Sequence, residues 1–256
     1  MNELNAEDRK KRIMDLLNRE GKVKVVDLSR MFGISEVTIR NNLSELEAAG
    51  MLERIHGGAI ITHHAYYNMS LKDRMRTNEE EKRRIAVKVV SMIAEGDTVM
   101  INSGTTTLIA AQKLKDIKNL TIVTNSVSIA QEIGHLKNIH VILLGGNFDP
   151  QYQYTFGDDA LHQLKKYKAD KLILAADGIS SEDGITTYHH LETELNRQMI
   201  ARVNKTFIVA DYTKIGRASF SCIDAIDNVD TLITDNKANQ DEINAIREKG
   251  VEVILV

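Results

Sequence analysis

The stretch RIMDLLNREGKVKVVDLSRMFGISEVTIRNNLSELEAAGMLERIHGGAI, residues 12–60, contains three short helical patterns followed by two extended pieces. Apolar residues recur at helical spacing and a glycine follows each pattern, so we predict helices at 8–20, 25–32 and 36–49. The pattern of the third helix turns Val37, Leu43 and Leu46 toward the other helices. The extended pieces lie around Gly57 and Gly58, and we predict a wing there.

The link between the second and third helices, Gly33-Ile34-Ser35, is typical of a helix-turn-helix, because glycine permits the bend and Ser35 can cap the next helix. The second helix of such a unit enters the major groove of DNA, and its N-terminal residues touch base edges. We expect base contacts from Ser35, Thr38, Arg40 and Asn41. We expect phosphate contacts from Arg9, Lys10, Lys11, Arg54 and His56, beside the wing glycines Gly57 and Gly58.

Charge does not by itself predict DNA binding. The formal net charge of the chain is −3, and residues 1–62 hold ten Lys and Arg against ten Asp and Glu. A nucleic-acid-binding domain usually carries a basic excess. A three-helix interaction module with solvated charges therefore remains the alternative for residues 1–62.

From residue 99 onward the chain changes character, with short apolar runs alternating with helical stretches. Such runs are typical of parallel strands buried on both faces, and the alternation predicts βαβ units in an α/β domain. The predicted strands are 99–102, 120–124, 139–144, 171–176, 206–210, 230–234 and 251–256. The predicted helices are 79–94, 104–115, 127–135, 158–167, 191–203 and 239–249. We therefore divide the chain into a winged helix-turn-helix domain (1–62), a linker (63–78) and a second domain (79–256), to which we assign effector sensing and oligomerisation.

Polar or glycine-rich turns follow five of the predicted strands. Ligands of open parallel sheets bind at the carboxyl ends of the strands, so these turns are expected to converge. The first turn opens a helix, where backbone N–H groups and the helix dipole favour an anion. The polar residues of this turn could equally well serve only to cap the helix. The candidate effector residues are Asn102, Ser103, Gly104, Thr105, Thr106, Thr124, Asn125, Ser126, Gly145, Gly146, Asp177, Asp211 and Lys214.

Residues 12–60 resemble the DNA-binding region of the DeoR family of bacterial regulators, whose usual pattern is S-x-x-T-I-R-R-D-L followed by L-x-R-x-x-G-G. Here the pattern begins at Ser35 and Leu52, and Asn41 and Asn42 replace the commoner Arg and Asp. The resemblance covers essentially the whole chain. It implies a Rossmann-like, mostly parallel sheet of the ribose-5-phosphate isomerase type that senses a phosphorylated sugar. It also implies that Asp177, Glu192, Asp211 and Lys214 match positions in or beside the effector pocket.

By this resemblance the chain is expected to repress a carbohydrate-utilisation operon and to leave its operator when a hexosamine, hexose or polyol phosphate binds. Segment 184–199, GITTYHHLETELNRQM, is most similar to regulators of N-acetylgalactosamine and polyol catabolism. Two departures concern the pocket. Tyr152 and Tyr154 replace serines of the family pattern, and Asn196 stands where relatives often carry Lys.

An isomerase-like enzyme with an accessory helical domain is the alternative function. Such isomerases need a lysine near the shared aspartate, but no lysine occurs between Lys171 and Lys205, so we expect no catalysis. Adjacent His189 and His190 with Glu192 could imitate metal ligands, but adjacent side chains point differently on most backbones, and no metal site is expected. We expect the phosphorylated effector to be the only small molecule that binds, and we expect no cofactor.

The remaining expectations concern location and assembly. The chain has a single cysteine, Cys222, and its N-terminus lacks the apolar core of a secretory signal, which favours the cytoplasm. It has no apolar run of roughly 18 residues, so we expect no membrane partner. We expect the partners to be double-stranded operator DNA, the phosphorylated sugar and further copies of the chain, as a dimer or a tetramer.

Overall fold

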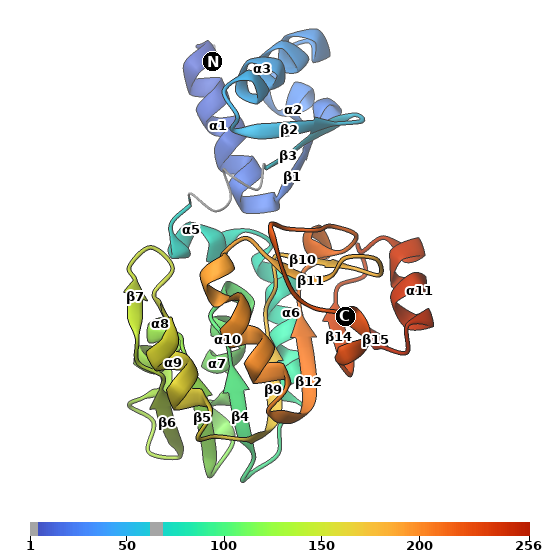
Figure 1. Ribbon diagram of the computed structural model, residues 1–256. Helices are drawn as coiled ribbons and strands as arrows, with labels where there is room; N and C mark the ends of the chain where they lie inside the picture. Colours follow the sequence, from blue (N-terminus) through green and yellow to red (C-terminus); the bar gives the residue numbers. More distant parts are fainter. Residues whose placement is uncertain (1–4, 62–68) are drawn as a thin grey trace. The chain divides into compact units, whose positions relative to one another are not determined.

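The computed structural model describes residues 5–61 and 69–256 (Figure 1). The chain forms two compact units, Met1–Glu79 and Glu80–Val256. Each unit has its own hydrophobic core, one among the first helices and one around the large sheet. The two units are therefore described separately.

The first unit is a winged helix-turn-helix. Its helices are α1 (Ala6–Glu20), α2 (Val25–Phe32) and α3 (Glu36–Ala48), and its strands are β1 (Lys22–Lys24), β2 (Leu52–Ile55) and β3 (Gly58–Ile61). The strands form an antiparallel sheet in the order β1-β3-β2. The predicted helices and wing are confirmed. Strand β1 was not predicted, because three residues are too few to show an alternating pattern.

Local chemistry sets the ends of these helices. Gly21 and Gly33 adopt left-handed conformations just after α1 and α2, and the Ser35 side chain accepts a hydrogen bond from the Thr38 N–H to cap α3. The expectation that Val37 faces the other helices is wrong, since its side chain is 63% exposed. Ile39 is fully buried instead, because it lies on the same helical face as Leu43 and Leu46.

The second unit is built on a seven-stranded sheet in the order β15-β14-β12-β9-β4-β5-β6. Every neighbouring pair is parallel. The strands are β4 (Thr98–Ile101), β5 (Leu120–Thr124), β6 (Ile139–Leu143), β9 (Ala169–Leu174), β12 (Val203–Val209), β14 (Thr231–Thr234) and β15 (Glu252–Leu255). All seven predicted strands are confirmed, and so is the α/β fold class.

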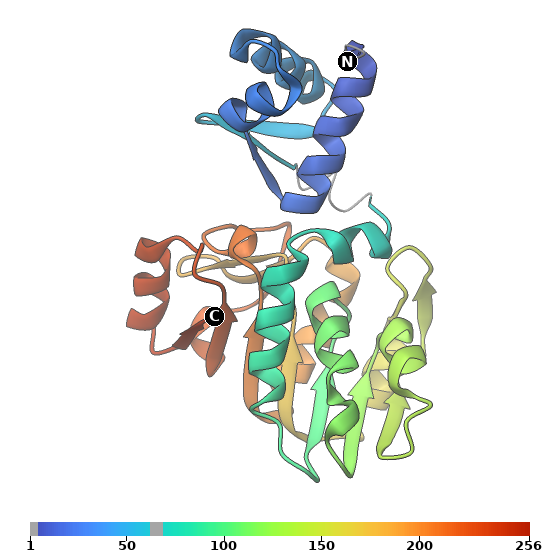
Figure 2. The same cartoon turned by 180° about the vertical axis from the view of Figure 1, so that it is seen from behind.

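Helices cover both faces of this sheet. Figures 1 and 2 show α9 (Asp158–Leu164) and α10 (His190–Ile200) on one face, and α6 (Glu79–Val90), α7 (Thr105–Gln112) and α8 (Val127–Ile133) on the other. Helix α11 (Gln240–Glu248) connects the two strands at one edge, β14 and β15. Each of these helices begins within one residue of its predicted start.

Several short elements were not predicted. Strands β7 (Asn147–Asp149) and β8 (Tyr154–Phe156) form a hairpin after β6, and β10 (Gly178–Ser180), β11 (Gly184–Thr187) and β13 (Ser221–Asp224) form a small antiparallel sheet. Short 3-10 turns lie at η1 (Leu114–Asp116), η2 (Tyr212–Lys214) and η3 (Ile226–Asn228). Within the segment predicted as a linker, Leu71–Arg76 forms helix α5, capped by Ser70, and residues 63–68 lie outside the described residues.

Candidate DNA-binding surface and effector site

The candidate base-contacting residues lie on the N-terminal half of α3. Ser35, Arg40 and Asn41 are exposed, and Thr38 is half-buried. The Ser35 hydroxyl lies 2.9 Å from that of Thr38 and also caps the helix, so its first role is to fix the start of α3. Arg40 reaches back to Glu36 with a 2.6 Å ion pair on the exposed surface, where water screens it. The exposed Val37 side chain adds an apolar group that sequence analysis placed in the core.

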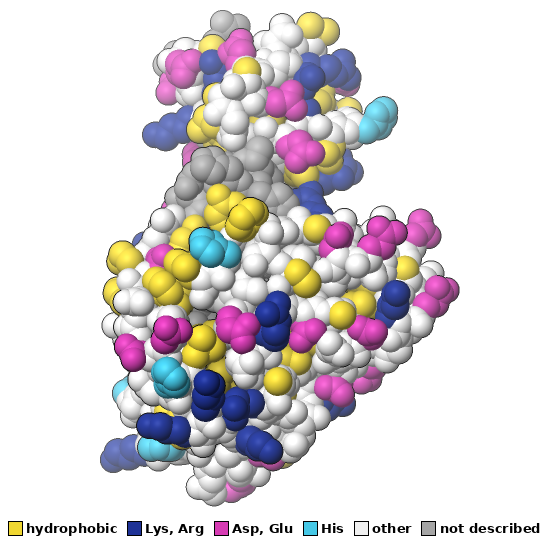
Figure 3. Space-filling model, viewed as in Figure 1, with side chains coloured by type: hydrophobic (Ala, Val, Ile, Leu, Met, Phe, Trp, Pro, Cys, Tyr) yellow, Lys and Arg dark blue, Asp and Glu magenta, His cyan; other side chains and the backbone are white. Residues whose placement is uncertain are grey.

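Two of the predicted phosphate-contacting residues, both on α1, make contacts that hold the unit together. Arg9 Nε donates to Asn42 Oδ1 over 2.7 Å and thereby joins α1 to α3. Lys10 pairs with Glu7 and, on α3, with Glu45. Figure 3 shows Lys and Arg interspersed with Asp and Glu on the visible face of this unit, in keeping with its formally neutral charge.

The wing is attached to α3 through Arg54. Its backbone N–H and Nε donate to the Glu47 carboxylate over 2.9 and 2.8 Å, and Nη1 donates to the Ser44 hydroxyl over 2.6 Å. These bonds hold the pKa of Glu47 below its usual range, the backbone N–H of Arg54 contributing most. At the tip, His56 is exposed and Gly57 has a φ of +75°. A Cβ at Gly58 would lie 2.1 Å from the Val23 oxygen, so packing of β3 on β1 explains that glycine.

The turn after β4 leads directly into α7. Asn102 is buried, and its side chain both donates to the Ala175 carbonyl and accepts from the Ala175 N–H, which joins the ends of β4 and β9. A Cβ at Gly104 would lie 2.6 Å from Ala175 Cβ, so this position also needs a glycine. Helix α7 has no side-chain cap at Gly104, and the N–H groups of its first turn have no partner within the helix. Capping by a side chain therefore does not account for this turn.

The turn after β5 is mainly structural. The Ser126 side chain caps α8, the Thr124 hydroxyl accepts from the Ser126 N–H, and the Asn125 side-chain amide donates to the Thr155 carbonyl. The glycines after β6 are also explained by packing. Gly145 donates its N–H to the Gln163 side chain, and a Cβ at Gly146 would lie 2.4 Å from the Phe156 oxygen.

One candidate carboxylate, that of Glu192, lies beside the start of α7, and a second, that of Asp177, lies beside the segment that leads into α10. Glu192, buried in the first turn of α10, accepts a 2.8 Å hydrogen bond from the Ser103 hydroxyl. Asp177, at the end of β9, accepts from the Tyr188 N–H over 2.9 Å and from the Thr187 hydroxyl over 3.1 Å. The structure therefore brings the turn after β4 together with Glu192, and it places Asp177 beside the segment that leads into α10.

Aromatic side chains complete this end of the sheet. Tyr152 and Tyr154 come from the β7–β8 hairpin, and Tyr188 and His189 immediately precede α10; the Tyr152 and His189 ring centroids are 3.9 Å apart. Burial, and then the Glu192 carboxylate, raise the pKa of Tyr154 far above its usual range, so its hydroxyl stays protonated. Sequence analysis noted the tyrosines only as departures from a pattern. The run YHH at 188–190 was the other available signal.

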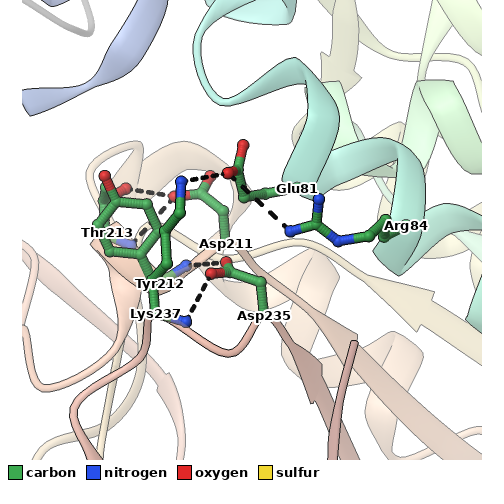
Figure 4. A network of polar contacts seen from close by, with 7 residues as sticks. All are labelled: Glu81, Arg84, Asp211, Tyr212, Thr213, Asp235 and Lys237. Atoms are coloured by element: carbon green, nitrogen blue, oxygen red, sulfur yellow. Dashed lines mark hydrogen bonds and ion pairs between the residues drawn. The ribbon is translucent and has the colours of Figure 1, made fainter.

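Asp211 lies in a second polar cluster, which Figure 4 shows. It is buried and accepts a hydrogen bond from the Thr213 N–H, while the neighbouring Asp235 accepts from the backbone N–H groups of Tyr212 and Lys237. Burial raises the pKa of Asp235, and the nearby Asp211 and Glu81 carboxylates raise it further. Lys237 forms a 2.6 Å ion pair with Glu81 of α6. Lys214 ends the 3-10 turn that follows Asp211.

Both units match known domains. Residues 9–65 match the DeoR-like helix-turn-helix domain, and residues 77–236 match the DeoR C-terminal sensor domain. The chain therefore belongs to the DeoR family of transcriptional regulators, as the sequence patterns predicted. Within residues 5–61 and 69–256, no helix is long and apolar enough to cross a membrane, and no group of three or more His, Cys, Asp and Glu is arranged to hold a metal ion.

Individual relatives are similar over nearly their whole length. The putative aga operon transcriptional repressor of Escherichia coli O157:H7 is 34% identical over 97% of this chain and 93% of the relative. The HTH-type transcriptional regulator GolR of Listeria innocua is 33% identical over 96% of this chain and 97% of the relative. The glycerol-3-phosphate regulon repressor of Escherichia coli K12 is 32% identical over 87% of this chain and 88% of the relative. Ribose 5-phosphate isomerase A of Methanocaldococcus jannaschii aligns at 14% identity, with a TM-score of 0.41, over 54% of this chain and 55% of that chain.

Proposed function

We propose that this protein represses a carbohydrate-utilisation operon and leaves its operator when a phosphorylated sugar binds at the carboxyl end of the seven-stranded sheet. The observation that carries the proposal is the start of α7, which follows a buried strand and has no side-chain cap. An anion there would accept hydrogen bonds from backbone N–H groups at the positive end of the helix dipole. The Asp177 and Glu192 carboxylates nearby would accept hydrogen bonds from sugar hydroxyls.

The relatives support this reading. One is named for the aga operon and another for the glycerol-3-phosphate regulon. We expect this chain to act as a dimer or tetramer in the cytoplasm, with Arg40, Asn41, Thr38 and Ser35 facing bases. The sugar phosphate would release DNA by favouring a second arrangement of the assembly, and it can do so only by its difference in affinity for the two arrangements.

Catalysis and cofactors other than the effector form no part of the proposal. A sugar-phosphate isomerase moves a proton along the sugar with a base and a lysine. The segment that contains Asp177, Tyr188 and Glu192 has no lysine between Lys171 and Lys205. The protein is therefore expected to return its ligand chemically unchanged, which NMR of the sugar phosphate after long incubation would check. An isomerised product would favour the enzyme instead.

The proposal is tested by thermal-shift screening of the full chain against hexose, hexosamine and polyol phosphates, followed by operator-release assays with each compound that binds. Binding to the native state alone raises the melting temperature. Asp177→Asn is expected to retain operator binding and to reduce release by the sugar phosphate, because it removes the negative charge and keeps one oxygen acceptor. The exposed Asp227→Asn is the matched control. If no phosphorylated sugar raises the melting temperature, the proposal is wrong.

A further inference from the structure

Rings from two distant parts of the chain meet at the carboxyl end of the sheet. The β7–β8 hairpin supplies Tyr152 and Tyr154, and the segment before α10 supplies His189. The His189 centroid lies 3.9 Å from Tyr152 and 6.2 Å from Tyr154, and the two tyrosine centroids are 6.4 Å apart. Tyr152 and His189 are half-buried, whereas Tyr154 is fully buried. We call these three residues the aromatic wall.

One buried polar atom of this wall lacks a partner. Among the described residues, nothing donates to or accepts from the Tyr154 hydroxyl. Leaving a buried polar group unpaired costs about 1–3 kcal/mol, so native proteins rarely keep such a group without a functional reason. A tyrosine hydroxyl can both donate and accept a hydrogen bond.

The wall adjoins the candidate effector site. The Glu192 carboxylate, which accepts from Ser103 beside the start of α7, is close enough to the Tyr154 hydroxyl to raise its pKa. On the other side, the N–H of Tyr188, the residue before His189, donates to Asp177. A molecule with its anionic group at α7 and its hydroxyls at Asp177 and Glu192 would therefore present its remaining surface to the aromatic wall.

The shape of a sugar decides how well it uses such a wall. A pyranose ring has a fixed face of C–H groups, and the negatively charged face of an aromatic ring attracts and packs against it. The open-chain polyol formed by reducing that sugar has no fixed face and loses more conformational freedom when it binds. The wall therefore discriminates between the two classes of sugar phosphate that the proposed function leaves open.

We propose that the aromatic wall makes this protein selective for a phosphorylated sugar in its ring form over an acyclic polyol phosphate. Tyr154 Oη donates to a ring substituent, and the Tyr152–His189 pair packs on the face of the ring. The inference rests on the proposed function, and it identifies Tyr154 as a residue that determines specificity.

The test compares matched probes by titration calorimetry on the full chain. Glucose 6-phosphate is paired with glucitol 6-phosphate, and galactose 6-phosphate with galactitol 6-phosphate, so that each pair differs in ring closure. We expect at least one ring form to bind about tenfold or more tightly than its open-chain counterpart, a difference of one hydrogen bond to a polar group. In Tyr154→Phe this preference should shrink by about the same factor.

Tyr154→Phe separates binding from structure, because the deleted hydroxyl bonds to nothing among the described residues and its loss should not lower the melting temperature of the free protein. Tyr167→Phe, which alters a partly buried tyrosine that packs on the core elsewhere, is the matched control and should bind all probes as the natural chain does. As a second variant, Tyr152→Ser removes the ring that packs at a tilt against His189 and should also reduce the preference for ring forms.

Each outcome is decisive. Loss of ring preference in Tyr154→Phe with an unchanged melting temperature supports the inference. Polyol phosphates that bind as tightly as ring forms overturn it and leave the proposed function in place. Equal affinity of Tyr154→Phe and the natural chain for the ring forms also overturns it. If no hexose, hexosamine or polyol phosphate raises the melting temperature, the proposed function fails, and the inference fails with it.

Discussion

The contact between Arg9 and Asn42 gives a quantitative prediction for the DNA-binding unit. Arg9 Nε donates to the side-chain oxygen Oδ1 of Asn42 over 2.7 Å, and Asn42 is only 4% exposed. Arg9→Ala leaves that oxygen buried without its donor, so we expect the free energy of unfolding to fall by about 1–3 kcal/mol. In a unit of this size, such a loss corresponds to about 4–8 °C in melting temperature per kcal/mol.

The assay is hydrogen exchange of the full chain, read by mass spectrometry over peptides from α1 and α3, together with thermal melting. Both helices should exchange faster in Arg9→Ala, and the exposed Arg12→Ala on the same helix is the control. The double variant Arg9→Ala/Asn42→Ala should lose less than the sum of the single variants, because the two residues form one contact. If Arg9→Ala exchanges no faster than Arg12→Ala, the contact does not stabilise the unit and Arg9 is again a candidate for phosphate binding.

Three further predictions follow from other contacts. Arg40→Ala should weaken operator binding about tenfold or more in gel-shift assays while the sugar phosphate still raises the melting temperature; unchanged DNA affinity would remove Arg40 from the interface. Lys237→Met should lower the free energy of unfolding by at most about 1 kcal/mol at neutral pH. Burial alone would raise the pKa of Glu81, but the Lys237 hydrogen bond, a backbone hydrogen bond and the charges of Lys237 and Arg84 together outweigh burial and hold that pKa below its usual range. The ion pair therefore stabilises the fold above the ordinary glutamate pKa, and this stabilisation is lost as the pH falls through the lowered pKa of Glu81. If Lys237→Met lowers the free energy of unfolding as much at about pH 3 as at neutral pH, measured by urea denaturation, the prediction is wrong. Gly104→Ala should destabilise the sensor unit by about 1–3 kcal/mol in the same assay, because its Cβ would lie 2.6 Å from Ala175 Cβ; an unchanged denaturation midpoint would mean that the turn relaxes freely.

Patterns that repeat along the chain were sufficient to predict the elements of the fold. The runs VMIN at 99–102 and LTIVT at 120–124 are mostly apolar or β-branched, because a parallel strand covered by helices is buried on both faces. Gly21 and Gly33 mark helix ends because the left-handed conformation there suits a residue without Cβ. Strands of three residues, such as β1 and β7, are too short to leave a pattern, and they depend on their partners.

The candidate effector site was only partly accessible from sequence. The strand-end rule correctly indicated that polar turns gather at one edge of the sheet. It could not assign functions within that edge. Gly146 and Asn102 proved to be required by close packing and by the join between β4 and β9. Asp211 lies beside Asp235 in a second cluster, because β12 and β14 are neighbours in the sheet although 21 residues separate the end of one from the start of the other.

Sequence alone determined the family, the two kinds of unit and the order of the strands along the chain, since each depends on residue types at short, regular spacings. The tertiary structure decided which side chains share an environment. The burial of Ile39 is not an example, because it follows from the helical spacing of Ile39, Leu43 and Leu46. By contrast, Tyr154 and His189 are 35 positions apart, and the burial of the Tyr154 hydroxyl without a partner follows from packing in three dimensions. No local pattern records such a contact, because its energy depends on distance through space rather than along the chain.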